Sequence, residues 1–308
     1  MTNEITNYRG RFAPSPSGPL HFGSLVAAMG SYLDARHAGG IWLVRMEDLD
    51  TPRVKPAAAD KILATLEAFG FEWDEKILRQ NNPHRSDAYR QALAKLAARD
   101  AIYRCACTRK EINESGVPGV EGSVYPGTCR INPPAGRAAK TIRVRTDDTG
   151  IGFRDLICGE IQQQVLSECG DFIVRRADGL VAYQLAVVVD DAFQGINRVV
   201  RGADLLFSTP RQIVLQKLLG LPTPEYAHLP LVKDANGRKL SKQSLAQPVN
   251  NAHPLPALLA AWRLLGQVKP EHDLGNPNEF WAWAVTKWKL SQVPKDSSMV
   301  SRLNLPAV

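Results

Sequence analysis

The segment RFAPSPSGPLHFGSL, residues 11–25, contains the pattern that decides the fold. Pro14 and Pro16 restrict the backbone and predict a rigid turn after a short strand. Helical spacing of apolar residues begins directly after His21, so His21 and Gly23 lie at the first turn of a helix. Backbone N–H groups at a helix start lack partners within the helix, and the helix dipole is positive there. The segment therefore favours an anion such as phosphate, although a helix-start histidine with no task fits this short pattern as well.

The residues around this segment predict an α/β domain of the nucleotide-binding type. We expect a strand over residues 8–13, a helix over 22–37 and a second strand over 41–46. A strand, a helix and a strand in this order form a parallel pair with a right-handed crossover. The acidic residues Glu47, Asp48 and Asp50 follow at the carboxyl end of the second strand.

The rest of the chain predicts one α/β domain that is interrupted by an insertion. Further helices are expected over residues 57–69, 86–98, 209–220, 254–265 and 279–288, with Ser86 or Asp87 as the N-cap of the second. Strands are expected over 140–145 and 171–176, and the apolar run 185–189 has the length of an interior strand. The predicted units are a Rossmann-like parallel-sheet catalytic domain in two halves (1–98 and 185–245), an inserted α+β subdomain (99–184) and a short helical C-terminal region (246–308).

The composition is that of an ordinary globular protein with a basic surplus. The 308 residues are 44% hydrophobic and 22% charged, and the formal net charge is +7. A basic balance favours a polyanionic partner, and it also fits a solvated basic surface. The N-terminus lacks the apolar run of a secretory signal, and no stretch approaches the ~20 apolar residues that span a bilayer. We therefore expect a cytoplasmic protein without membrane contact.

Three of the five cysteines are clustered in the predicted insertion. They are Cys105, Cys107 and Cys129. In a reducing compartment such clustering indicates a metal before it indicates disulfides. The thiolates would supply three of the four tetrahedral ligands of one structural zinc ion, which would fasten an irregular insertion. The fourth ligand stays open among Tyr125, Glu111 and Glu121, and three free thiols are the alternative.

A second phosphate-binding candidate is GRKLSKQS, residues 237–244. Lys239 and Lys242 bracket a serine in what reads as a mobile loop led by glycine. Point charges on such a loop can move onto a polyphosphate and neutralise it. The chain has neither the P-loop pattern nor the G-x-G-x-x-G pattern, so a nucleotide would need another device of this kind. Taken alone, this segment also fits a basic surface turn.

Together and in this order, the two segments resemble the paired signatures of the class I aminoacyl-tRNA synthetases. HFGS at 21–24 is similar to the "HIGH" element, and KLSKQ at 239–243 is similar to the "KMSKS" element. RFAPSPSGPLH, RMEDLD and VVRGADLLFSTPRQ resemble the glutamyl-tRNA synthetase group in particular. Ser24, Leu240 and Gln243 depart from the usual letters, while the residues that touch phosphate are kept.

The resemblance implies a pocket for glutamate. Arg11 and Arg201 would grip the side-chain carboxylate of the amino acid and exclude neutral glutamine. Glu47 would hold the substrate ammonium group. The implied glutamate-binding set also contains Phe12, Ala13, Pro14, Ser15 and Tyr183. Ordinary ion pairs of the two arginines, and a core position for Tyr183, are the alternatives.

The resemblance also implies how ATP is bound and used. The implied ATP-binding residues are His21, Gly23, Lys239 and Lys242. Among them, His21 and Lys242 would act as catalytic residues that stabilise charge while the substrate carboxylate attacks the α-phosphorus, with Mg²⁺ on the phosphates. Tyr125 falls where a related zinc-bearing group has its fourth ligand.

The length of the chain narrows the resemblance further. Only 65 residues (308 minus 243) follow Gln243, too few for the anticodon-binding domain of a full glutamyl-tRNA synthetase. Together with the cysteine insertion, this resembles the glutamyl-queuosine tRNA(Asp) synthetases. That family activates glutamate without tRNA and then esterifies it onto queuosine in the anticodon loop of tRNA(Asp). A monomer is expected. The alternatives are a truncated glutamyl-tRNA synthetase that charges a 3′ end, and a catalytically inactive zinc-stabilised RNA-binding module.

Overall fold

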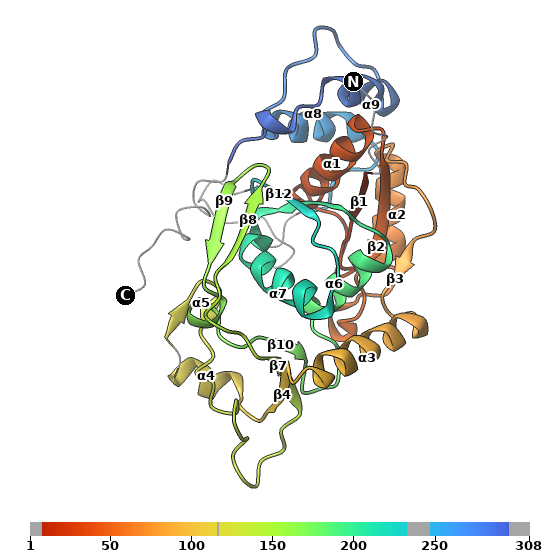
Figure 1. The fold of residues 1–308 in the computed structure, drawn as a ribbon. Coiled ribbons are helices and arrows are strands. Elements are labelled where there is room, and N and C mark those ends of the chain that lie inside the picture. The colour runs from red at the N-terminus through yellow and green to blue at the C-terminus, as the bar shows by residue number, and fades with distance from the viewer. Residues whose placement is uncertain (1–7, 116, 233–246, 296–308) are drawn as a thin grey trace.

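The computed structural model describes residues 8–115, 117–232 and 247–295. Its centre is a layer of parallel strands from both halves of the predicted catalytic domain, with one strand from the predicted insertion (Figure 1). These are β1 (Arg9–Phe12), β2 (Ile41–Met46), β3 (Leu78–Arg79), β8 (Ile151–Asp155), β11 (Arg198–Gly202) and β12 (Glu225–Leu229). One group pairs in the order β1-β2-β3 and the other in the order β11-β12-β8, all in parallel.

Strand β11 lies beside β1 and joins the two groups. The backbone N–H of Asn197, just before β11, donates to the carbonyl of Arg9 at 3.1 Å. The strand order is therefore β3-β2-β1-β11-β12-β8. The strands stay parallel, but the chain adds them toward opposite edges of the sheet on either side of the β1–β11 pair. Such a reversal opens a crevice at the carboxyl ends of the strands in folds of the Rossmann type. The predicted Rossmann-like parallel sheet is confirmed.

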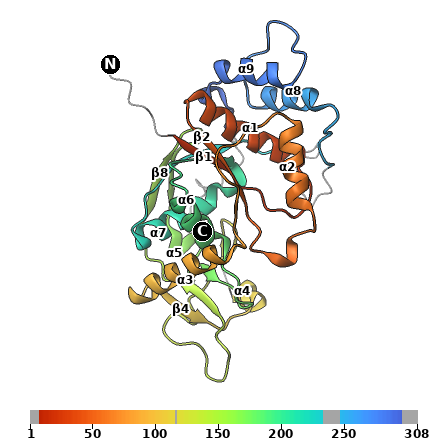
Figure 2. The same ribbon diagram turned by 90° about the vertical axis from the view of Figure 1, so that its right-hand side faces the viewer.

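Helices cover both faces of this layer (Figures 1 and 2). One face carries α1 (Phe22–His37), α2 (Ala58–Ala68), α8 (Pro254–Leu264) and α9 (Pro277–Lys287), and the other carries α3 (Pro83–Ala98), α6 (Tyr183–Phe193) and α7 (Thr209–Leu219). Successive side chains of a strand point to opposite faces, so Trp42 and Val44 join the first apolar cluster and Leu43 joins the second. The ends of the strands are thereby held between two packed layers.

Helix α1 packs closely against the sheet. A Cβ atom added to Gly30 would lie 2.5 Å from Cδ1 of Leu229 in β12. Interiors are packed too densely to accept such an overlap, so glycine is what allows this approach. The first turn of α1, which follows its N-cap His21, thus lies next to the end of β12.

Helix α3 begins earlier than the sequence predicts. Its N-cap is Asn82, and neither Ser86 nor Asp87. The Asn82 side chain accepts the backbone N–H of His84 at 3.0 Å. Pro83 then occupies the first helical position, which suits proline because no helical hydrogen bond needs its missing N–H. The helix signal was therefore present one turn upstream of the predicted cap.

The apolar run 185–189 was assigned the wrong type of element. It lies in helix α6, which packs against α3 and α7. The polar residues of α6, Gln184, Asp190 and Asp191, lie outside this run of five, so the run by itself shows no helical period. A short apolar run is ambiguous between a strand and a buried helix for this reason.

The region between α3 and α6 contains a second, antiparallel sheet (Figure 1, lower half). Its strands are β4 (Ile102–Cys105), β7 (Thr141–Val144) and β10 (Ile173–Arg175). Around it lie α4 (Arg109–Ser115), β5 (Pro118–Gly119), β6 (Gly122–Ser123) and α5 (Val165–Glu168). Strand β8 and its hairpin partner β9 (Gly159–Gln163) belong to this region by sequence, yet β8 pairs with β12 of the catalytic layer. The strands of 140–145 and 171–176 were predicted, whereas α4 and the β8–β9 hairpin were not.

The C-terminal helices are anchored to the catalytic layer by tryptophans. The indole N–H of Trp281 donates to the carbonyl of Phe69 at 2.8 Å, and that of Trp288 donates to Asp34 at 3.3 Å. Short 3-10 turns complete the fold: η1 (Thr51–Arg53), η2 (Ala203–Ser208) and η4 (Leu290–Gln292). In the part of the chain that the structure describes, no helix combines the length and apolarity required to cross a bilayer.

Candidate active site

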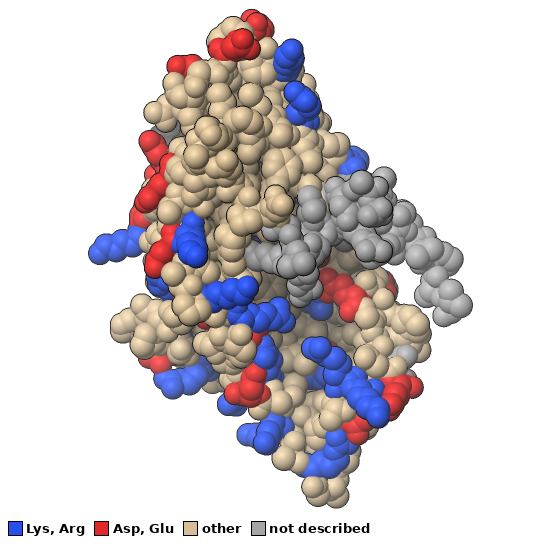
Figure 3. Space-filling view, turned by 180° about the vertical axis from the view of Figure 1, so that it is seen from behind, with Lys and Arg blue, Asp and Glu red and all other residues tan. Residues whose placement is uncertain are grey.

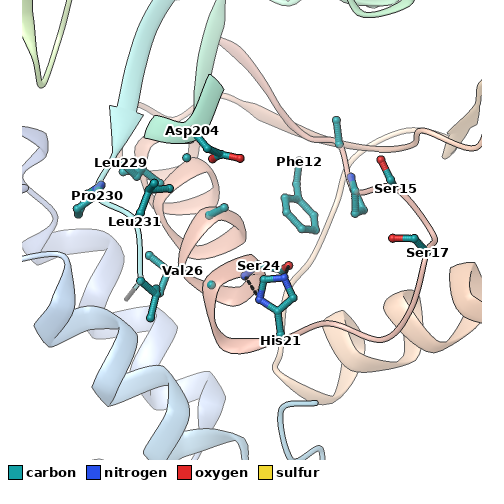
Figure 4. A pocket seen from close by; sticks show the side chains of 16 residues that line it. Phe12, Ser15, Ser17, His21, Ser24, Val26, Asp204, Leu229, Pro230 and Leu231 are labelled. Atoms are coloured by element: carbon teal, nitrogen blue, oxygen red, sulfur yellow. Dashed lines mark hydrogen bonds between the residues drawn. The ribbon is translucent and has the colours of Figure 1, made fainter. Parts of the chain in front are cut away.

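A cavity of about 280 Å³ opens at the carboxyl ends of β1, β11 and β12 (Figure 4). The sequence-predicted residues on its wall are Phe12, Ala13, Pro14, Ser15, His21 and Gly23. Gly202 and Asp204 after β11, and Pro230 after β12, close the other side. The cavity lies where the strand order reverses, which is where α/β folds of this type bind ligands.

His21 lies at the rim of this cavity as the N-cap of α1. Its Nδ1 accepts the backbone N–H of Ser24 at 3.2 Å, and its Nε2 lies 3.0 Å from the Ser24 hydroxyl oxygen. Because Nδ1 accepts, the ring proton is on Nε2 and the imidazole is neutral. Ser24, the departure from the usual motif, therefore orients the histidine beside the positive end of the helix dipole.

The described ends of the lysine segment both meet the cavity. Val232 lines it, and Pro248 forms an antiparallel bridge with His21. The backbone N–H of Val249 also donates to the carbonyl of Leu20 at 3.0 Å. Lys239 and Lys242 lie outside the described residues. The described residues on either side of them, Val232 and Pro248, both lie close to His21 or to the cavity that it lines.

The four side chains predicted to hold glutamate come together beside the cavity. Arg11 lies in β1, Glu47 follows β2, Tyr183 begins α6 and Arg201 lies in β11. The charges of the other three residues all act on the pKa of Tyr183, and the Tyr183 hydroxyl oxygen lies 3.4 Å from Nη1 of Arg201. Burial raises the pKa of Tyr183, so its hydroxyl keeps its proton. These elements are far apart in sequence, and the parallel layer brings their ends to one place.

Arg201 differs from most buried arginines because it has no acidic partner. It is 5% exposed, and in the described part of the chain it forms no ion pair. Its guanidinium instead donates to neutral groups, among them the Thr209 hydroxyl at 2.8 Å and the His228 Nε2 at 3.1 Å. Buried charges are ordinarily paired because desolvation is costly. An unpaired buried guanidinium is therefore a site for an anionic ligand.

Two charged residues that sequence reasoning missed complete the cluster. Asp191 accepts from Arg11 at 3.1 Å and from Arg45 at 2.7 Å, and Arg45 also contacts Glu47 at 3.3 Å. Burial alone would raise the pKa of Asp191, but the two guanidiniums outweigh it and hold this pKa below its usual range. The available signals were a charged residue inside the apolar strand IWLVRM and the acidic pair that ends VVVDD.

The ionised form of the Glu47 carboxyl group is disfavoured by its burial. Burial raises the pKa of its carboxyl group, although Arg45 and Arg11 lower it in part. A carboxylate whose ionised form is disfavoured by burial gains from a further cation.

The cysteine cluster forms a separate candidate metal site. The Sγ atoms of Cys105, Cys107 and Cys129 all lie within 4.8 Å of one another. The Tyr125 hydroxyl oxygen lies 3.3 Å from Sγ of Cys105 and 3.6 Å from Sγ of Cys107, and it accepts the backbone N–H of Cys129 at 2.9 Å. Donor atoms around a tetrahedral zinc ion are separated by about 3.5–3.8 Å, given metal–ligand distances of about 2.0–2.3 Å. The four residues therefore fit one metal ion.

The other two candidate fourth ligands are engaged elsewhere. Glu111 pairs with Arg137 at 2.7 Å, and Glu121 pairs with Arg211. Neither carboxylate belongs to the cluster of donor atoms in the described chain. Tyr125 therefore remains the candidate for a fourth donor.

A larger cavity of about 810 Å³ lies between the cysteine cluster and α7. Basic side chains on its wall are Arg109, Lys140, Arg143, Arg176 and Arg211. Figure 3 views the molecule from the side opposite to Figure 1. Lys and Arg side chains are gathered there around a hollow in the lower half. Such a basic hollow suits the phosphates of a nucleic acid.

Comparison with known proteins defines the class. The family described as tRNA synthetases class I (E and Q), catalytic domain, matches residues 7–256. A solved glutamate tRNA ligase from Elizabethkingia meningosepticum, in complex with its amino acid, superposes with a TM-score of 0.75 at 25% identity, covering 97% of this chain and 69% of that chain. The fold is thus that of a class I synthetase catalytic domain.

Curated relatives are similar over nearly the full length of both chains. The glutamyl-Q tRNA(Asp) synthetase of Dechloromonas aromatica is 56% identical over 94% of this chain and 97% of its own length. The protein of the same name from Chromobacterium violaceum is 53% identical over 96% of this chain and 97% of its own length. The chain therefore belongs to the glutamyl-Q tRNA(Asp) synthetase family, within the class I synthetases of the E and Q group.

Proposed function

We propose that this protein activates glutamate with ATP, without tRNA, and then transfers the glutamyl group to queuosine in the anticodon loop of tRNA(Asp). The names of its relatives at 48–56% identity support this reaction. The structural observation that carries it is Arg201, which is 5% exposed and has no ion pair in the described chain. A buried guanidinium without an ion pair at the strand ends favours an acidic substrate.

In the activation complex, the side-chain carboxylate of glutamate lies between Arg11 and Arg201. Glutamine in its place would direct an amide NH₂ at a guanidinium, which has donors only, so it is rejected. Glu47 binds the α-ammonium group. Phe12, Ala13, Pro14 and Ser15, which line the strand-end cavity, and Tyr183, which lies beside Arg201, would complete this pocket.

Activation is an in-line displacement at the α-phosphorus of ATP. An oxygen of the substrate α-carboxylate forms the new P–O bond while the bond to pyrophosphate breaks. His21 donates from Nε2 to the phosphate oxygens, and Gly23 allows the nucleotide to approach the backbone. Lys239 and Lys242 neutralise charge on the leaving pyrophosphate. Mg²⁺ bound with ATP supplies further positive charge at the phosphates.

Transfer of the glutamyl group uses the same cavity at the strand ends, here called the cleft. A hydroxyl of the queuosine cyclopentenediol attacks the carbonyl carbon of the glutamyl-adenylate, an ester forms, and AMP leaves. The basic cavity beside the cleft suits an anticodon stem-loop, whose phosphates bind Lys and Arg and whose loop bases are unstacked. ATP and a tRNA substrate place the reaction in the cytoplasm, and a monomer suffices because one chain contains the cleft.

The cysteine cluster has a structural task in this proposal. One zinc ion bound by Cys105, Cys107, Tyr125 and Cys129 fastens the insertion. The proposed division is a catalytic domain in two halves (1–98 and 185–245), the zinc-bearing insertion (99–184) and the helical region (246–308).

Two assays with purified, metal-replete protein test the proposal. Glutamate-dependent exchange of pyrophosphate into ATP without tRNA is expected, followed by transfer to tRNA(Asp) that carries queuosine and none to tRNA(Asp) that lacks it. Charging of tRNA(Glu) alone would favour a synthetase that acts on a 3′ end. Absence of exchange would favour an inactive RNA-binding module.

A further inference from the structure

A buried chain of hydrogen bonds holds Arg201 from behind. It begins at Asp155, the last residue of β8, and passes through His228 of β12 (side chains 0% exposed). The Asp155 Oδ2 atom lies 2.6 Å from Nδ1 of His228, and Nε of Arg201 donates to Nε2 of His228 at 3.1 Å. Three neighbouring strands, β8, β12 and β11, thus contribute one residue each.

The chemistry of arginine assigns the protons in this chain. A guanidinium has donors only, so Nε2 of His228 must be the acceptor. The ring proton is then on Nδ1 and is donated to Asp155. The other carboxylate oxygen of Asp155 accepts the backbone N–H groups of Ile157 at 3.0 Å, Cys158 at 2.8 Å and His228 at 3.3 Å, which fixes its orientation.

The titration of the pair agrees with this assignment. Burial lowers the pKa of His228, and Arg201 adds to this effect, so the imidazole is neutral. Burial would raise the pKa of Asp155, but the bond to His228 and the backbone N–H groups outweigh it and hold that pKa below its usual range. The arrangement is a carboxylate, a neutral imidazole and a guanidinium in line.

We propose that Asp155 and His228 are positioning residues that set glutamate specificity through Arg201. A neutral acceptor holds the Nε edge of the guanidinium while leaving its charge unpaired. Arg11 shows the contrast, because Asp191 contacts it directly at 3.1 Å and neutralises it in part. The Nη1 edge of Arg201, which makes only a long contact with the Tyr183 hydroxyl at 3.4 Å in the described chain, then faces the carboxylate of the substrate. This inference rests on the proposed function, because it concerns the same pocket.

The sharpest test is Asp155→Asn. The asparagine oxygen would take the three backbone N–H groups, so its NH₂ group would face Nδ1 of His228. The ring proton would have to move to Nε2, where it opposes the N–H of Arg201 and has only the Thr209 hydroxyl, at 3.2 Å, as an acceptor. The KM for glutamate in pyrophosphate exchange should rise about tenfold, the size expected when a hydrogen bond to a charged group is lost, while the KM for ATP stays unchanged. ¹⁵N NMR of labelled histidine should show the change of tautomer.

A matched control separates this role from general stability. Asp34 is another buried carboxylate with hydrogen bonds, to Tyr8 at 2.8 Å and Trp288 at 3.3 Å, and it lies outside the pocket. Asp34→Asn should lower the midpoint of thermal unfolding and leave the KM for glutamate unchanged. If Asp155→Asn behaves in the same way, the chain only stabilises the fold and the proposal is wrong.

If Asp155→Asn does not fold, a second pair of variants tests the proposal. His228→Gln keeps an acceptor oxygen for Arg201, so the KM for glutamate should stay near that of the wild type. His228→Phe removes the acceptor, so this KM should rise about tenfold. Equal KM values in the two variants would overturn the proposal. Wild-type exchange is measured first, because its absence would refute the proposed function rather than this inference.

Discussion

The strand-end pocket and the cysteine region are stabilised by different means. The pocket lies between two large apolar clusters, which contain Trp42, Phe69 and Val199 among many others. The buried cluster around the cysteines has only four residues in the described chain. Where a large apolar core stabilises the fold, charged side chains are not needed for stability and can serve binding and chemistry. Where it is small, polar and sulfur groups must hold the chain together.

Changes in the pocket should therefore affect catalysis, and changes in the cysteine region should affect stability. The largest effect is expected for Lys242→Ala, which removes a charge that matters most as pyrophosphate leaves. The kcat for pyrophosphate exchange should fall about 100-fold or more, with little change in the KM for glutamate. Lys217→Ala, an exposed lysine of α7, is the control and should retain full exchange. An unchanged rate in Lys242→Ala would contradict the assigned role.

Arg201→Ala should have the next largest effect. It deletes a buried partner of the substrate carboxylate, so kcat/KM for glutamate should fall about 30-fold or more in steady-state exchange kinetics. Arg198 is a matched control on the same strand, because its side chain is 24% exposed and pairs with Glu225 at 2.7 Å. Equal losses in Arg201→Ala and Arg198→Ala would break the distinction between binding and structural arginines.

Cys107→Ser tests the other region. Loss of one sulfur should release the bound zinc and lower the midpoint of thermal unfolding by about 5 °C or more, as followed by metal analysis and calorimetry. Pyrophosphate exchange by the folded protein should remain near that of the wild type. Cys169→Ser is the control, because Cys169 lies outside the sulfur cluster. If Cys107→Ser keeps a normal zinc content, the proposed zinc site is wrong.

The smallest expected effect is a dependence of stability on pH. Burial lowers the pKa of His228 in the folded chain, whereas an unfolded histidine titrates near pH ~6.5. Above this pH both states are neutral there and the full stability is present. Below it only the unfolded state takes up the proton, so the free energy of unfolding falls by up to about 1.4 kcal/mol per pH unit. Urea unfolding at several pH values should show a shallower slope for His228→Gln, and identical slopes would contradict a buried neutral imidazole.

Local patterns predicted the parts of the site that lie near each other in sequence. The turn after β1, the start of α1 at Phe22 and the strand Ile41–Met46 agree with the structure because their signals are contained within a few residues. The missed elements lacked such signals. The apolar run within α6 is too short to show a helical period, and the hairpin of β8 and β9 has a glycine in each strand, Gly152 and Gly159.

Residue type and spacing alone determined that a basic α/β protein would present a helix start at His21 with unsatisfied N–H groups, a lysine segment and a cysteine cluster. Tertiary structure alone decided that Asp191 would bridge Arg11 and Arg45, and that His228 would hold Arg201 without neutralising it. The physical reason is the distance along the chain. Arg11 and Asp191 are 180 residues apart, and only the packing of parallel strands with their carboxyl ends at one edge brings such side chains within hydrogen-bonding distance.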